Sequence, residues 1–326
     1  MLYSVAAANA LIATGQPLTI AGDENALARL QRGRWIGGTI PYFLTRKGGL
    51  VDRERVFVTG LPKEARGTRI GFVGADDLAA LPRQAPEHGL SLVIVPGLSP
   101  VHLAYAVGVH NLPDFFTKPI AGWVSGVHLD DLARVKPKVF NGETGEASTD
   151  RLVALHADLP PSLSAIIGIV NLFRQGDGDR IRFANTGFAA QECWINGRKT
   201  DLYDYVKTHA VDLRLPLVAD LSGEMINVSF QTVDDASHSV KFYAPVLSDI
   251  EYRQAAPLAG DYRDALLGQL ARHPITPFFA CNCILNYLYA GLEGDRPIDV
   301  EGPATFGEIA YILLNQTLVH IDLRSN

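Results

Sequence analysis

Apolar and polar positions alternate along the first 145 residues in short, strand-length and helix-length segments. Residues 90–98 (LSLVIVPGL) are a continuous apolar run, which is typical of a central buried strand. Ser99 and Pro100 follow, and these residue types predict the cap and first turn of a helix over 99–110. Around this unit, after a short opening helix, the pattern predicts strands at 17–22, 34–44, 55–61 and 69–75 and helices at 24–32 and 75–89.

After residue 145 the pattern changes to short, β-rich segments. Asn196-Gly197 lies between two of them and is a strong hairpin turn signal. Apolar runs and helical periodicity predict three helices between these strands, and strands again near the end of the sequence. The predicted helices cover 161–175, 201–210 and 261–273, and the last predicted strands cover 276–290 and the closing segment 302–323.

A boundary between two parts is predicted at residues 141–150 (NGETGEASTD), where glycine and polar residues cluster. The segments on either side contain both helices and strands. We therefore predict an α+β (mixed α/β) fold with two sub-domains, residues 1–145 and 146–326, each with a β-sheet flanked by helices.

Composition narrows the class of protein. The 326 residues are 47% hydrophobic and 20% charged, with a net charge of −6 and scattered basic residues, so we expect no nucleic-acid partner. The longest apolar runs fall short of the ~20 residues that span a bilayer, and the opening segment does not look like a signal peptide. We expect no membrane association. Three cysteines make no disulfide framework, which favours the cytoplasm.

Gly37, Gly38 and Thr39 form the first candidate site, inside the predicted strand 34–44. Two glycines let a backbone approach a ligand closely, and the threonine adds a hydroxyl group. The alternative is a strand bulge or close strand packing, and these residues alone favour that alternative.

Cys281, Asn282 and Cys283 form the second candidate. On a strand the two cysteines share one face, and Asn282 takes the other. Two thiolates leave a zinc site two ligands short, and no histidine spacing supplies the rest, so we expect no metal. Buried cysteines usually behave as small apolar residues, whereas a buried Asn282 needs hydrogen-bond partners.

The closing segment is the third candidate. Glu308 follows a glycine and precedes an apolar run, and a buried carboxylate there would need a cation, a donor or a proton. In a regular strand Asn315 and Thr317 share one face and Gln316 takes the other. The structural alternative is an edge strand with a solvated acid in its turn; the functional one is a pocket wall with Glu308 as acceptor for an ammonium or amide group.

Two of these segments resemble FIST (F-box and intracellular signal-transduction) domains. NCILNYLY (282–289) is similar to the family's N-C-x-x-R stretch, with Asn286 in place of its arginine, and GPATFGEIAYILLNQTLV (302–319) resembles its closing motif. IGGTIPYF (36–43) is similar to its N-terminal glycine- and threonine-rich strand. By this match Asn282 and Cys283 take the family's Asn-Cys positions, Phe306, Gly307, Glu308 and Ile309 its aromatic-Gly-Glu-Ile, and Asn315, Gln316 and Thr317 its Asn-Gln-Thr.

The resemblance implies a sensory module that binds small ligands such as amino acids, or haem in some members, and passes its signal to a separate protein. We therefore expect a non-catalytic small-ligand-binding protein without a cofactor. Its pocket is expected between the two parts, at Gly37, Gly38, Thr39, Asn282, Cys283, Phe306, Gly307, Glu308, Asn315 and Thr317.

Two alternatives remain open at the level of sequence. An enzyme would use Cys283 as a nucleophile or Glu308 as a general acid or base. A haem-based gas sensor would use His102, His273 or His320 as the axial ligand of a non-covalently bound haem.

Overall fold

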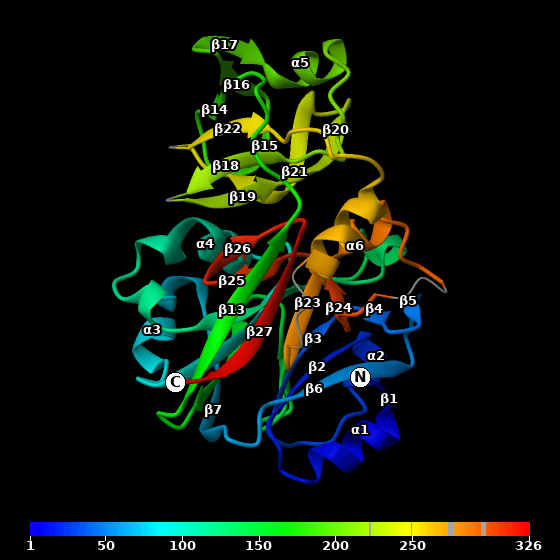
Figure 1. Cartoon of the computed structure of the whole chain (residues 1–326), viewed down its shortest axis with the longest axis vertical. Coiled ribbons are helices and arrows are strands. Elements are labelled where there is room, and N and C mark those ends of the chain that lie inside the picture. The colour runs from blue at the N-terminus through cyan, green and yellow to red at the C-terminus, as the bar shows by residue number, and fades with distance from the viewer. Residues whose placement is uncertain (222, 249, 273–276, 295–297) are drawn as a thin grey trace.

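The structure is a computed structural model, and it describes residues 1–221, 223–248, 250–272, 277–294 and 298–326. Within these residues the fold is mixed α+β, with five sheets and seven α-helices. Strands hold 44% of the chain and helices 20%, so most of the core lies between sheets. Three sheets form a body, and the other two form a lobe, residues 181–254, at the top of Figure 1.

The central sheet of the body is built around β8 (Gly89–Pro96), all of whose residues are buried. β8 pairs in parallel with β9 (Ile120–Ser125), and the helix α4 (Pro100–Gly108) connects the two. Ser99 accepts a hydrogen bond from His102 N at 3.2 Å, which confirms the predicted cap. From one edge the strand order is β26 (Ile312–Leu314), β25 (Glu308–Ala310), β9, β8, β12 (Leu152–Asp158) and β7 (Arg66–Val73).

Both faces of this central sheet are buried, as the apolar run 90–98 predicts. Alternation sends Leu92 and Ile94 of β8 to one face and Val93 and Val95 to the other. The first face is covered by two further sheets, and the second by α4 and α3 (Ala80–Gln84). One covering sheet has the strand order β1 (Leu2–Ser4), β6 (Arg55–Gly60), β2 (Leu18–Gly22), β3 (Trp35–Thr39), β10 (Val139–Asn141) and β11 (Glu146–Ser148). The other has the order β13 (Leu163–Asn171), β27 (Thr317–Ser325), β23 (Phe279–Cys283), β24 (Gly302–Thr305), β4 (Tyr42–Thr45) and β5 (Gly48–Val51).

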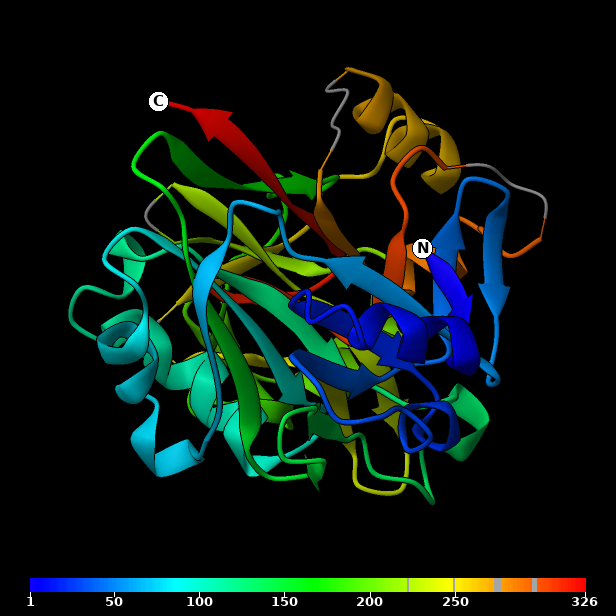
Figure 2. The same ribbon diagram turned by 90° about the horizontal axis from the view of Figure 1, so that it is seen from below.

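Helices complete the body on the outside. The helices α1 (Val5–Ile12) and α2 (Glu24–Leu27) pack on the sheet that contains β2 and β3. The helix α6 (Tyr262–Arg272) lies over the sheet that contains β13 and β27 and buries Leu266 and Leu270 (Figure 2). The remaining body helices are α7 (Ile284–Tyr289) and the 3-10 turns η1 (Ala75–Asp77), η2 (Val109–Asn111), η3 (Phe115–Thr117) and η4 (Leu129–Asp131).

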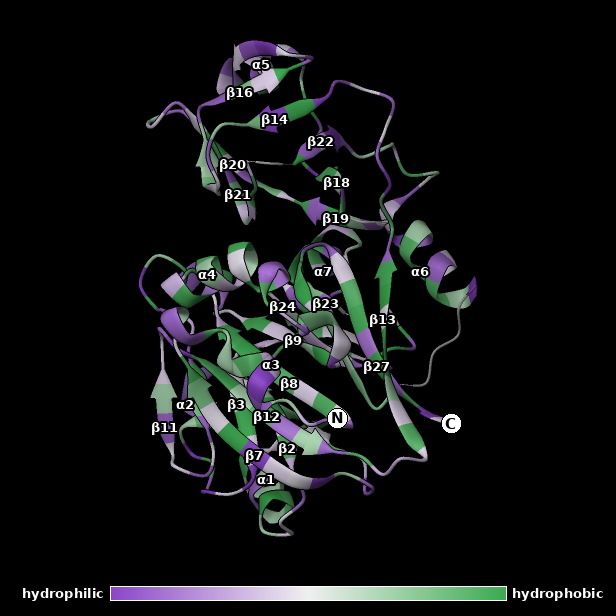
Figure 3. Ribbon diagram, turned by 90° about the vertical axis from the view of Figure 1, so that its left-hand side faces the viewer, coloured by the Kyte–Doolittle hydropathy of each residue, from purple (hydrophilic) through white to green (hydrophobic). Residues whose placement is uncertain are grey.

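The lobe consists of two sheets and the helix α5 (Leu202–Thr208), and it stands on the body at the end where α4 and β26 lie (Figures 1 and 3). Its core residues belong to the same apolar cluster as the outer face of the central sheet. Asn196 and Gly197 have φ values of 50° and 84° and form the predicted hairpin turn. The larger lobe sheet has the strand order β17 (Arg198–Asp201), β16 (Glu192–Ile195), β14 (Ile181–Phe183), β22 (Glu251–Gln254), β18 (Leu217–Leu221) and β19 (Glu224–Val228). The smaller has the order β15 (Gly187–Ala190), β21 (Ser239–Val246) and β20 (Phe230–Asp234).

Two predicted elements are wrong. Residues 161–175, predicted as a helix, contain the strand β13, which pairs with β27 from Leu163↔Ser325 to Asn171↔Thr317. Residues 276–290, predicted as a strand, contain the short strand β23 followed directly by α7. Both are apolar runs that local periodicity cannot assign, and tertiary pairing decides them.

The mixed α+β class is confirmed, but two sub-domains with separate sheets are not. The central sheet combines β7, β8 and β9 with β12, β25 and β26, and the sheet of β13 also takes strands from both sides of residue 145. The boundary between 1–145 and 146–326 therefore stays a prediction. In the described part of the chain no helix has both the length and the apolar character needed to cross a bilayer.

We predict that Gly38→Ala destabilises the body. A Cβ atom at Gly38 would lie 2.6 Å from both Ile94 Cγ2 and Trp123 Cη2, in the contact between β3 and the central sheet. We expect a loss of ~1–3 kcal/mol in the free energy of unfolding, measured by urea denaturation. Gly71→Ala on β7 is the matched control because no atom lies within 4 Å of its added Cβ. Equal stability of the two variants would contradict the packing described here.

Candidate functional site

Glu308, the first residue of β25, is fully buried where the central sheet faces β27. Thr317 donates to its Oε2 atom twice, from the backbone N at 3.2 Å and from Oγ1 at 2.8 Å. Thr305 Oγ1 lies 3.3 Å from the other carboxyl oxygen. Desolvation outweighs these hydrogen bonds and raises the pKa of Glu308 to about 8. The carboxyl group therefore holds a proton at neutral pH.

Cys283 ends β23, and its thiol contacts the Glu308 carboxyl group. The backbone N–H groups of Leu285 and Gln316 also point to the sulfur, and Asn315 Nδ2 lies 3.8 Å from it. Burial, together with the nearby Glu308, raises the pKa of the Cys283 thiol well above its usual range. Nucleophilic attack and metal binding both require a thiolate, so this environment favours neither role.

Asn315 connects this centre to the lobe. Its Oδ1 atom accepts a hydrogen bond from Ser229 N at 3.3 Å, and its backbone oxygen accepts one from Asn227 Nδ2 at 3.1 Å. Ser229 Oγ donates to Gln316 Oε1 at 2.6 Å. All four residues are buried, so these are hydrogen bonds inside the junction of body and lobe. We call the whole set the polar cluster: Asn227, Ser229, Cys283, Thr305, Glu308, Asn315, Gln316 and Thr317.

A break in the closing segment brings these side chains together. A regular strand would place Asn315 and Thr317 on one face, but β26 ends at Leu314 and Gln316 has a φ of 58°. This left-handed residue separates β26 from β27 and lets Asn315 reach the lobe while Thr317 reaches Glu308. The condition of a regular strand is therefore not met, although both residues do take part in the cluster.

Asn282 faces the other side of its sheet, as its position between the two cysteines predicts. Its Oδ1 atom accepts from Asn286 Nδ2 at 2.8 Å, and Asn286 Oδ1 accepts from Tyr262 OH at 2.7 Å. Tyr262 OH accepts in turn from Gln316 Nε2 at 2.9 Å. Asn282 Nδ2 is buried and has no hydrogen-bond partner among the described residues. Asn286 thus joins Asn282 to Tyr262 in a hydrogen-bond chain under α6.

The structure does not bring Gly37, Gly38 and Thr39 into the polar cluster. Gly38 packs against Trp123, and Thr39 Oγ1 accepts a hydrogen bond from Lys138 N at 2.9 Å. These residues serve close packing between sheets, which is the structural alternative that the sequence left open. Phe306 and Gly307 lie closer: Gly307 O accepts from Val124 N at 2.8 Å and fixes the turn before Glu308, while the Phe306 ring lies over Gly126.

The two described candidate haem ligands, His102 and His320, lie in different parts of the body. His102 is buried in α4, where desolvation lowers its pKa to about 4, and its ring contacts Phe188 of the lobe. His320 lies on the outer face of β27, with Nδ1 2.9 Å from Asp322 Oδ2. His273 lies outside the described residues. The two described histidines do not converge on one haem-sized site, and haem binding stays a prediction.

A hollow of about 700 Å³ opens beside the polar cluster. It lies between α6 and the two connections that join the lobe to the body, residues 172–180 and 255–261. Asn171, on its wall, exchanges hydrogen bonds of 2.9 and 3.3 Å with Asn227 of the cluster. Sequence reasoning missed this site because its walls are some eighty residues apart in the chain. Its principal side chains are Leu172, Phe173, Arg174, Leu258, Asp264, Gln269 and Arg272.

Comparison with known proteins places the chain in a family. A protein-family model, described as a family of unknown function (DUF6976), matches residues 3–324, which is almost the whole chain. The chain belongs to the DUF6976 family. No curated protein and no solved structure matches this DUF6976 chain.

We predict that Glu308 makes this DUF6976 protein less stable as the pH rises. Its folded-state pKa of about 8 exceeds the ordinary value of 4.5, so its stabilising contribution is complete below pH 4.5 and is lost progressively as the pH rises to about 8. Between pH 5 and 8 we expect the wild type to lose on the order of a few kcal/mol more than Glu308→Gln, measured by urea denaturation. The exposed Glu64→Gln should behave as the wild type. Parallel pH profiles for all three proteins would show that Glu308 is not held neutral.

We predict that Cys281 and Cys283 do not react with iodoacetamide in the native DUF6976 protein at pH 7. Both are buried, and desolvation raises the pKa of each thiol well above its usual range. Intact-mass spectrometry should detect alkylation of the three cysteines after unfolding and none before it. Rapid native labelling of Cys283 would instead support the enzyme alternative.

Proposed function

We propose that this chain is a non-catalytic, small-ligand-binding sensory protein whose ligand occupies the hollow between α6 and the two lobe connections. The proposal rests on one observation. A hollow large enough for a small molecule is lined by both connections and by Asn171, which is hydrogen-bonded to Asn227 of the polar cluster. Its volume of about 700 Å³ lies within the ~300–1,000 Å³ range of small-molecule sites.

The side chains around the hollow suit an amino-acid-like ligand. Arg174 and Arg272 offer guanidinium groups for a carboxylate, and Asp264 offers a carboxylate for an ammonium group. Among the described residues Arg174 and Asp264 take part in no ion pair, so both are available to a charged ligand. Leu172 and Leu258 supply apolar wall for a side chain. The resemblance to FIST domains, whose ligands include amino acids, supports the same chemistry.

The connections give such a ligand a route to the lobe. Residues 172–180 lead into the lobe and 255–261 lead out of it, so a molecule bound between them and α6 would bias how the lobe is held. Asn171, on the wall of the hollow, is hydrogen-bonded to Asn227, and Asn227 is hydrogen-bonded to Asn315. A ligand that moves Asn171 would therefore also act on the junction of body and lobe. A separate signalling protein that recognises the lobe would then read the bound state. The three free, buried cysteines favour the cytoplasm as its location.

The enzyme alternative has one observation in its favour, the contact between the Cys283 thiol and the Glu308 carboxyl group. Full burial of both groups and the raised pKa of each argue for a structural role instead. We therefore rank ligand binding above catalysis.

The test is a binding experiment on the full chain. Native mass spectrometry of the purified protein should reveal a co-purifying small molecule, and titration calorimetry with the common amino acids and small dicarboxylates should identify a binder. Arg174→Ala and Asp264→Ala should each weaken that binding by about 10- to 100-fold, because each removes a charge-assisted contact.

Arg263→Ala is the matched control, since Arg263 lies on the same helix but does not line the hollow. Hydrogen exchange in residues 172–180 and 255–261 should slow when the ligand binds. The proposal fails if no compound in either experiment binds, or if a bound compound is indifferent to both hollow variants.

A further inference from the structure

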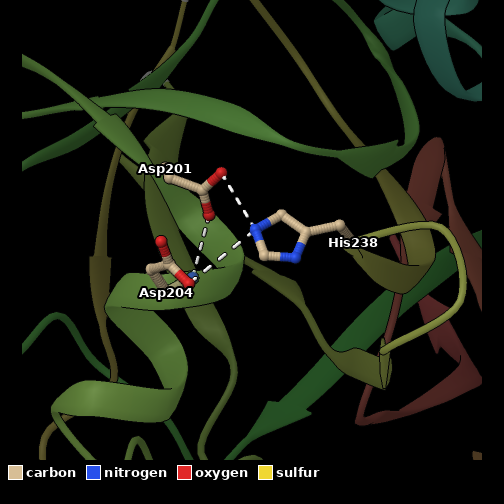
Figure 4. Close-up of side chains that lie close together, drawn as sticks. All are labelled: Asp201, Asp204 and His238. Atoms are coloured by element: carbon tan, nitrogen blue, oxygen red, sulfur yellow. Dashed lines mark hydrogen bonds and ion pairs between the residues drawn. The ribbon is translucent and has the colours of Figure 1, made fainter.

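Three side chains on the lobe converge at a point away from the polar cluster and the hollow. Asp201 ends β17 and caps α5, where its Oδ1 atom accepts a hydrogen bond from Asp204 N at 2.9 Å. Asp204 follows in the first turn of α5, and His238 comes from the turn between β20 and β21. Figure 4 shows both carboxylates turned toward the same nitrogen of the imidazole ring. The chain thus brings two elements together at one mixed oxygen and nitrogen donor set.

The distances in this set are those of an ion pair, and they are also those of ligands that share one cation. His238 Nε2 lies 3.4 Å from Asp201 Oδ2 and 3.7 Å from Asp204 Oδ1, and the three donor atoms lie within 4.8 Å of one another. Hydrogen bonds between such atoms are usually 2.7–3.2 Å long, roughly half an ångström shorter. Ligands at ~2.0–2.2 Å from a tetrahedral zinc ion lie about 3.3–3.6 Å from each other.

Neighbouring side chains hold the set in place without occupying it. The Tyr203 ring lies against the His238 ring, with centroids 4.1 Å apart and the planes tilted by 34°, and supports one side of the imidazole group. Lys207, the lysine of α5, forms an ion pair with Asp235 at 3.1 Å. Among the described residues, Asp201 and Asp204 therefore have no lysine partner. Two adjacent carboxylates repel each other, and a cation between them removes that cost.

We propose that Asp201, Asp204 and His238 bind one first-row divalent metal ion, with Zn²⁺ the best match. An imidazole nitrogen favours zinc and its neighbours over Ca²⁺ and Mg²⁺, which prefer oxygen ligands alone. Three protein ligands at an exposed position leave coordination open to water or to a group from a partner. The bound ion ties the start of α5 to the turn between β20 and β21.

The experiment titrates the full chain with ZnCl₂ after treatment with EDTA. We expect one zinc ion per chain, and we expect Asp204→Asn and His238→Ala each to weaken binding by more than about tenfold. His209→Ala is the matched control, because His209 lies just beyond the far end of α5. Asp204→Asn keeps the backbone N–H that donates to the capping Asp201 side chain, so we expect this variant to fold. It provides the test if His238→Ala does not fold.

A second measurement separates this site from the cysteines. Protein loaded with Co²⁺ should lack the thiolate-to-metal absorption that a cysteine ligand produces, since the proposed donors are oxygen and nitrogen only. The proposal is overturned if zinc does not bind stoichiometrically, if both variants bind it as the wild type does, if thiolate absorption appears, or if Ca²⁺ or Mg²⁺ binds more tightly than Zn²⁺. If His238 only forms ion pairs with Asp201 and Asp204, zinc will not bind stoichiometrically.

Discussion

The buried carboxyl group of Glu308 is the constraint on which the centre of this protein depends. A group of this kind, removed from water, must hold a proton or find donors, and Glu308 does both. Its partners come from separate strands: Thr317 begins β27, Thr305 ends β24 and Cys283 ends β23. Satisfying one acid therefore fixes the relative positions of the central sheet and the sheet that covers it.

The same constraint extends to the lobe. Asn315 and Gln316 lie in the break between β26 and β27, and both exchange hydrogen bonds with the lobe residues Asn227 and Ser229. Because these groups are buried, losing one partner would leave another unsatisfied, at ~1–3 kcal/mol for each group. The lobe is thus held to the body by polar contacts as well as by its share of the apolar core. A ligand beside Asn171 would act on the edge of this network.

The predicted site residues Cys283, Glu308, Asn315 and Thr317 meet at this centre rather than around an open pocket. Glu308 contacts Cys283 and Thr317, whereas Asn315 and Gln316 accept hydrogen bonds from the lobe residues Asn227 and Ser229. Hydrogen bonding between buried groups therefore explains why polar residues occur inside these apolar strands. The hollow lies beside them, under α6. The lobe carries the second set of convergent donors, at Asp201, Asp204 and His238, where the start of α5 meets the turn between β20 and β21.

The sequence by itself determined the features that depend on neighbouring residues. The buried run of β8, the Ser99 cap and the Asn196-Gly197 turn were all predicted, because burial pattern, capping and positive φ are local properties. It also indicated that Glu308, Asn315 and Thr317 belong together.

Tertiary structure alone decided the rest. β13 is a strand because β27 lies beside it, and Gly38 is a packing residue because Trp123 lies against it. The hollow and the proposed metal site each join segments that are far apart in the chain, and no local pattern records which distant segments will meet. Contacts of that kind form only when the sheets assemble, because their energy comes from burial that a single segment cannot achieve.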